Sequence, residues 1–102
     1  MATVTTRILL FNLGQKLATH GALDALAEAG LPPTVLLRRH QTGDWGELDD
    51  HDKLANARAL VDGSRILSAY HLKTGTRIWV ITDAADDIGH RASTTVLLPS
   101  EY

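Results

Sequence analysis

The stretch RILSAYHLKTGTRIWVITD, residues 65–83, decides the fold of this chain. Its two halves, 65–72 and 76–83, are rich in β-branched and aromatic residues, and residues 73–75 between them have the composition of a hairpin turn. A third run of the same kind, STTVLLP, follows at 93–99. We therefore predict an antiparallel β-meander of three to four strands.

The middle run has apolar side chains on both of its faces. Ile78 and Val80 point to one face and Trp79 and Ile81 to the other, because successive strand residues alternate. A sheet with two apolar faces needs cover, so helices are expected on at least one face. The fold class that follows is α+β, with about three short helices packed on the meander.

Two of these helices are expected in the first half of the chain. Thr19 suits the N-cap of a short helix, and Gly30 suits the left-handed position that ends it. A second short helix is expected from Pro33, with Gly43 as its stop.

The third helix is the best supported. Asp49 is a good N-cap, Asp52 completes a capping-box arrangement, and Gly63 follows the last helical residue. Four apolar residues recur at helical spacing and predict the face that packs inward: Leu54, Ala57, Leu60 and Val61.

The N-terminal part contains a further strand candidate. The run TRILLFNL predicts a strand from Arg7 to Leu13, with a continuation over Gln15–Ala18 after a kink at Gly14.

Length and composition indicate one domain spanning residues 1–102, of which 44% are hydrophobic. No apolar run approaches the roughly 18 residues of a membrane span, and a signal peptide is not recognisable, so we expect a cytoplasmic protein without membrane contact. The absence of cysteine excludes disulfides, thiolate zinc sites and cysteine nucleophiles.

Charge is concentrated in the middle of the chain. The net charge is −2, but residues 43–62 alone carry six acidic and two basic side chains. No segment is basic enough for strong direct binding to nucleic acid.

Metal and cofactor motifs are missing. The five histidines never occur at i, i+4 spacing, and the DDHD sequence at 49–52 lacks the glycine and the bidentate glutamate of a calcium loop. Glycine-rich phosphate loops are also absent. We expect neither a metal nor a cofactor.

Two candidate sites remain. One lies on the meander and consists of His71, Arg77 and Asp83, which could act as a general acid, a phosphate clamp and a base. Such a trio could form the catalytic site of a small toxin-like ribonuclease. The other candidate is the segment around Trp45, where five acids precede the third helix; its binding residues are Asp44, Trp45, Glu47, Asp50 and Asp52. Helix capping explains most of these acids, and Trp45 either fixes the helix to the sheet or contacts a partner.

Several motifs spread over most of the chain resemble a family of short, largely uncharacterised bacterial proteins of plasmids and integrated elements. They are TGDWGEL (42–48), ANARAL (55–60), RILSAY (65–70), IWVIT (78–82) and TTVLLPSEY (94–102). The link at 83–92 is longer here than in that family.

The resemblance implies a mobile-element setting, in which small proteins act by binding. We therefore expect a protein partner. One candidate is a nucleoprotein complex of host defence (CRISPR or restriction), and the acidic segment would cover the basic nucleic-acid channel of that complex. The ribonuclease is the alternative, and a homo-oligomer stays open. The C-terminal LLPSEY (97–102) docks either on a partner or on the chain's own sheet.

Overall fold

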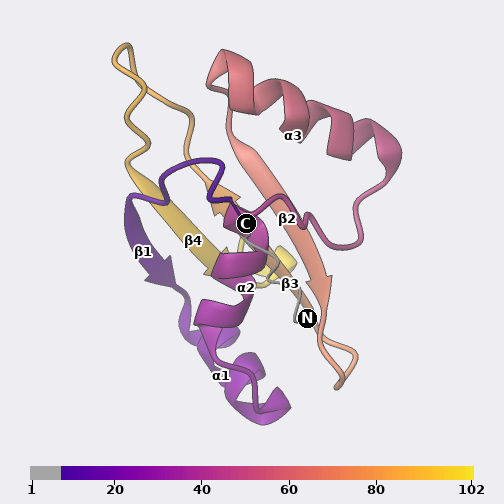
Figure 1. Cartoon of the computed structure of the whole chain (residues 1–102). Helices are drawn as coiled ribbons and strands as arrows, with labels where there is room; N and C mark the ends of the chain where they lie inside the picture. Colours follow the sequence, from indigo (N-terminus) through magenta and orange to yellow (C-terminus); the bar gives the residue numbers. More distant parts are fainter. Residues whose placement is uncertain (1–7) are drawn as a thin grey trace, which may run out of the picture.

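The computed structural model describes residues 8–102 and shows an α+β fold with three helices and a four-stranded, mostly antiparallel sheet (Figure 1). The strand order is β1-β4-β3-β2, and β1 runs parallel to β4. The elements are β1 (Gln15–Ala18), α1 (His20–Ala29), α2 (Pro33–Gln41), α3 (Asp50–Asp62), β2 (Ile66–His71), β3 (Arg77–Thr82), β4 (Ser93–Leu97) and the short 3₁₀ helix η1 (Pro99–Glu101).

The predicted meander is confirmed. β2 and β3 pair from Ile66 opposite Thr82 to His71 opposite Arg77, and β3 continues antiparallel to β4. The turn between β2 and β3 contains Gly75 at φ +92°, a conformation that glycine adopts without strain.

The prediction of a strand from Arg7 to Leu13 is wrong for residues 8–13, which form no strand. The predicted continuation over Gln15–Ala18 is confirmed and is β1. Arg7 itself lies outside the described residues. The reason is Gly14, at φ +64°, where a Cβ would lie 2.3 Å from the carbonyl oxygen of Arg91. Only a residue without a Cβ fits at this close approach, and pairing with β4 begins directly after it, at Gln15.

Helix α2 lies over one face of the sheet and α1 lies at the lower end of α2 (Figure 1), and both helices contribute residues to the core on that face. The ends of α1 are as predicted: the Ala22 N–H donates to Thr19 Oγ1 (3.1 Å), and Gly30 is left-handed at φ +68°. Helix α2 begins at Pro33 as predicted, and its C-cap is Thr42, with the predicted stop Gly43 next at φ +90°. The core between helices and sheet includes Leu26, Leu36, Ile78, Val80 and Val96.

Helix α3 has the predicted N-cap Asp49 and the predicted C-terminal Gly63, whereas the Asp52 carboxylate contacts His51 and does not complete the predicted capping box. The inward face of the helix is not the predicted one. Leu54 and Val61 are 51% and 90% exposed, whereas the buried residues are Asn56 and Ala59. The helix lies along the outer edge of β2, and the Asn56 side chain hydrogen-bonds both backbone groups of Leu67 (2.6 and 3.1 Å). The Asn56 amide satisfies both backbone groups of Leu67 at the open sheet edge, which an apolar side chain could not do, and this pairing turns Asn56 toward the strand.

The C-terminus docks on the chain itself. The ring of Tyr102 packs edge-on against Trp79 with centroids 5.8 Å apart, and Glu101 accepts a hydrogen bond from the Thr19 hydroxyl (2.6 Å). None of the helices in residues 8–102 combines the length and apolar character needed to cross a bilayer.

Candidate functional site

The segment that carries the acids is hydrogen-bonded to the edge of β2. The Ala69 N–H donates to the Trp45 carbonyl (3.1 Å), and the Glu47 N–H donates to the Ala69 carbonyl (2.7 Å). Gly46 between them has φ +72°, and a Cβ there would lie 2.0 Å from the Ala69 oxygen. The close approach therefore requires glycine, and it fixes the segment on the sheet.

Trp45 is half-buried in an aromatic cluster. Its ring lies 6.3 Å from that of Phe11 and 5.9 Å from that of His40, between centroids. The tryptophan thus anchors the acidic segment to the end of α2.

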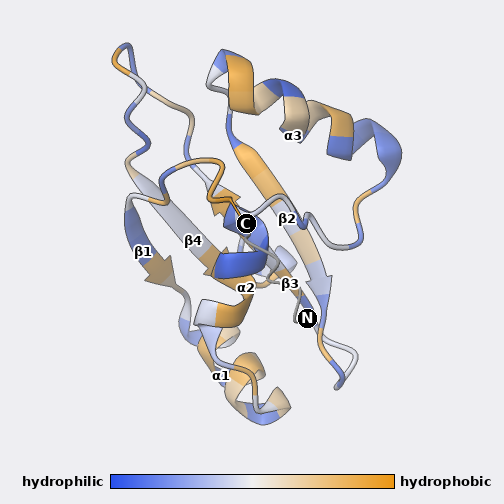
Figure 2. Cartoon of the chain, viewed as in Figure 1, coloured by the Kyte–Doolittle hydropathy of each residue, from blue (hydrophilic) through white to orange (hydrophobic). Residues whose placement is uncertain are grey.

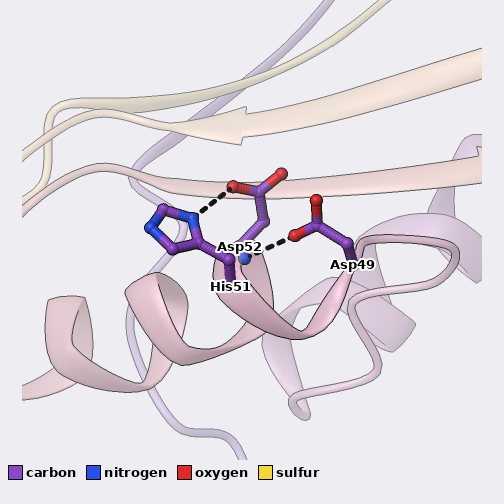
Figure 3. Close-up of side chains that lie close together, drawn as sticks. All are labelled: Asp49, His51 and Asp52. Atoms are coloured by element: carbon purple, nitrogen blue, oxygen red, sulfur yellow. Dashed lines mark hydrogen bonds and ion pairs between the residues drawn. The ribbon is translucent and has the colours of Figure 1, made fainter.

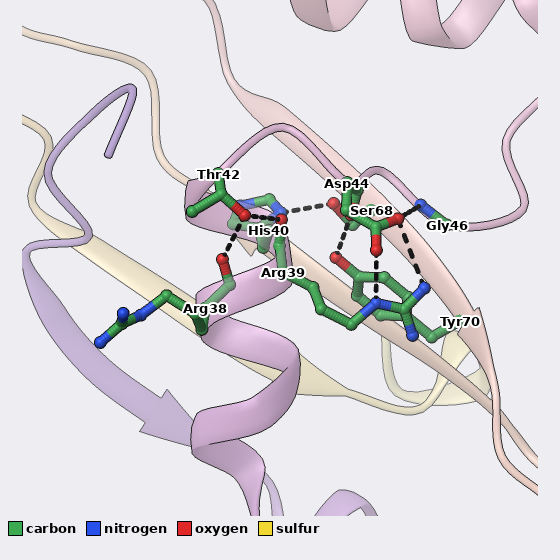
Figure 4. A network of polar contacts seen from close by, with 8 residues as sticks. All are labelled: Arg38, Arg39, His40, Thr42, Asp44, Gly46, Ser68 and Tyr70. Carbon is green, nitrogen blue, oxygen red and sulfur yellow. Dashed lines mark hydrogen bonds and ion pairs between the residues drawn. The ribbon is translucent and has the colours of Figure 1, made fainter. Parts of the chain in front are cut away.

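Asp44 belongs to this anchor as well (Figure 4). Its carboxylate accepts hydrogen bonds from Arg39 Nε (2.6 Å) and Nη2 (3.3 Å), and its carbonyl accepts one from the Tyr70 hydroxyl (2.6 Å). The hydrogen bond to Asp44 raises the pKa of the Arg39 guanidinium. The charge of Asp44 is therefore balanced within the chain.

The remaining acids of the segment are exposed: Glu47, Asp49, Asp50 and Asp52. Figure 2 shows the resulting hydrophilic start of α3, with hydrophobic residues farther along the helix.

Asp49, His51 and Asp52 come close together in the first turn of α3 (Figure 3), with their ligand atoms within 4.8 Å of one another. The Asp49 carboxylate accepts the Asp52 N–H (2.8 Å), as an N-cap does, and all three side chains are open to solvent. Helix capping accounts for this arrangement, which does not by itself make a metal centre.

The structure brings His71 and Arg77 together and leaves Asp83 apart. Arg77 Nε–H donates to His71 Nε2 (3.0 Å), so the other ring nitrogen, Nδ1, carries the proton of the neutral imidazole and donates to the Glu47 carboxylate. Asp83 lies at the other end of β3, about 20 Å along the strand, where it accepts a hydrogen bond from Ser93 (2.8 Å).

A cleft of about 300 Å³ opens between the acidic segment, the first turn of α3 and the strands β2 and β3. It is lined by Glu47, Leu48, Asp49, Asp52, Leu67, Ala69, Tyr70, His71, Arg77 and Trp79. Three carboxylates thus face one guanidinium. Glu47 belongs to the predicted binding segment and His71 to the separate predicted catalytic trio; their pairing across 24 positions has no sequence signal.

A second polar network lies inside the core. His40, fully buried, hydrogen-bonds Ser68 (2.5 Å) and Thr82 (2.9 Å), and the chain continues through Thr94 (2.7 Å) to the Leu13 carbonyl (2.7 Å). The Leu13 carbonyl can only accept, so the Thr94 hydroxyl donates to it and in turn accepts from the Thr82 hydroxyl. Thr82 must then accept from His40 Nε2–H, which leaves His40 Nδ1 as the acceptor for the Ser68 hydroxyl. Burial lowers the pKa of His40 to about 3. The network is sealed from solvent and is structural.

Comparison with known proteins yields no match to the chain among family models, curated proteins or solved structures. The site is therefore defined by its own geometry. That geometry consists of an exposed acidic surface on a fixed backbone and an adjoining cleft of mixed charge.

Proposed function

We propose that this protein acts by binding another protein through an acidic surface formed by Glu47, Asp49, Asp50 and Asp52. The observation that carries the proposal is the combination of exposure and fixed backbone. The four carboxylates are open to solvent, while the segment before α3 is hydrogen-bonded to the edge of β2 and α3 is capped. A surface ordered before binding loses less conformational entropy on association.

The chemistry of this surface favours a basic partner. Residues 43–62 carry four more acidic than basic side chains, and charge complementarity accelerates encounter with a positive surface. The partner we propose is a nucleoprotein complex of host defence in the cytoplasm, of CRISPR or restriction type, whose nucleic-acid channel the acidic surface covers. The resemblance to mobile-element proteins supports this setting.

Direct binding of nucleic acid is less well supported. Arg39 is paired with Asp44, and Arg91 is buried, donating to the carbonyls of Ala59, Ser64 and Asp83. These two guanidinium groups are therefore already occupied within the chain.

Charge removal tests the proposal. A triple variant, Asp49→Asn, Asp50→Asn and Asp52→Asn, is expected to slow association with the partner at least about tenfold at low salt and to flatten its salt dependence. Asparagine also caps helices, so the melting temperature should hardly change. Asp44 is left intact because its loss would release Arg39.

The control is Asp87→Asn, which removes one exposed charge from the link at 83–92, away from the acidic surface. Association rates that are equal for the triple variant and this control would contradict the proposal.

The ribonuclease stays as a second candidate because His71 and Arg77 do touch, with Glu47 in the place expected of Asp83. Asp49 and Asp52 beside them repel a polyanion, so we expect the purified protein to leave RNA intact. RNA cleavage that is present in the wild type and lost in His71→Ala would establish the enzyme instead.

A further inference from the structure

We infer that the cleft between α3 and the β2–β3 hairpin takes up an arginine side chain of the partner. The inference rests on the proposed function and specifies what the partner presents at the acidic surface. It follows from the charge, the lining and the size of the cleft.

The charges that line the cleft determine that its occupant is a cation. Arg77 is held on His71 through its Nε–H, and the neutral imidazole in turn donates to Glu47. Arg77 and Glu47 largely balance each other through this chain, which leaves the carboxylates of Asp49 and Asp52 in the lining. A cation is therefore stabilised in the cleft, and a phosphate or carboxylate is repelled.

The remaining lining favours arginine over lysine. The half-buried Trp79 provides an aromatic surface, and its ring is held by the edge contact with Tyr102. A planar guanidinium stacks on an aromatic ring and pairs with a carboxylate at the same time, whereas an ammonium is a compact charge. Leu48 and Leu67 can cover the methylene stem.

The same combination already exists within the chain. The Arg39 guanidinium lies 4.5 Å above the Tyr70 ring and pairs with Asp44. An aromatic ring and a carboxylate at one edge of this sheet thus hold a guanidinium in the folded protein. The cleft offers Trp79 with Asp49 and Asp52 in the corresponding roles.

The size of the cleft limits the occupant to one side chain. About 300 Å³ is at the lower end of the range for ligand sites, which suits a single side chain better than a nucleotide.

The test uses N-acetyl-arginine amide as the probe and nuclear magnetic resonance of the full chain as the readout. We expect a saturable shift of the Trp79 indole N–H signal. Trp45 lies outside the cleft and serves as the internal control. The neutral citrulline amide should cause no shift.

Three single variants sharpen the test. Asp49→Asn and Asp52→Asn should each weaken binding of the arginine amide severalfold, because each removes one lining carboxylate. Asp50→Asn removes a charge from the same helical turn but not from the lining, and should leave the affinity unchanged.

Two results would overturn the inference: no saturable shift of Trp79 with the arginine amide, or a saturable shift with inorganic phosphate in its place. If either occurs while partner association still depends on the acidic surface, the cleft assignment fails and the proposed function stands. If the arginine amide binds but the triple variant associates with the partner as fast as the wild type, the cleft binds a guanidinium, and the proposed function fails together with the assignment of that arginine to the partner.

Discussion

Single residues determine how the sheet, the helices and the acidic segment are joined. His40 illustrates this best, because its ring bonds Ser68 on β2 and Thr82 on β3 from the end of α2. Gly46 allows the acidic segment to touch Ala69. Neither role is visible in the sequence, where His40 is one of five scattered histidines.

The buried imidazole predicts a pH dependence of stability. Burial lowers the pKa of His40 to about 3 in the folded protein, below the ordinary value of 6.5 in the unfolded chain. The unfolded state therefore binds the proton first, and the free energy of unfolding should fall by about 1.4 kcal/mol per pH unit as the pH drops below 6.5 toward 3.

Urea unfolding of the wild type and His40→Gln between pH 7 and 4.5 measures this effect. In the variant, the free energy of unfolding should fall less steeply with decreasing pH, because the contribution of His40 is gone. The difference between the two proteins separates this contribution from that of the carboxylates, which titrate at lower pH. Parallel pH profiles for the two proteins would contradict the prediction.

At the scale of elements, local sequence signals predicted where the helices begin and end. They did not predict which face of α3 is buried. Thr19, Gly30, Asp49 and Gly63 act within a turn of their own position, so their roles could be predicted from the sequence. The inward face of α3 depends on the distant edge of β2, which selects Asn56 over the apolar stripe. The hydrophobic period alone could not indicate this.

The orientation of α3 predicts an unusual order of mutational effects. Asn56→Ala should lower the free energy of unfolding by about 2–3 kcal/mol, because it leaves the Leu67 N–H and carbonyl without their partner. Leu54→Ala, at a side chain that is 51% exposed, should cost less than about 1 kcal/mol. Urea unfolding of both variants measures the difference, and the opposite order would show that the leucine faces the sheet.

At the scale of the whole molecule, the candidate site combines segments that are far apart in the chain. Two of the predicted binding residues, Glu47 and Asp52, share one cleft with two of the three predicted catalytic residues, His71 and Arg77. The α+β class and the meander could be predicted because strand patterns and turns are local. The cleft could not, because it arises only where the acidic segment crosses the edge of β2.

We propose that the exposed carboxylates before and within the first turn of α3 bind a protein. The most direct measurement is paired affinity capture from host lysate at moderate salt, using the tagged wild type, the triple variant at Asp49, Asp50 and Asp52, and the Asp87→Asn control. We predict one stoichiometric partner that the wild type and the control retain and the triple variant loses. Equal retention by all three proteins, or recovery of the wild type alone, would contradict the claim.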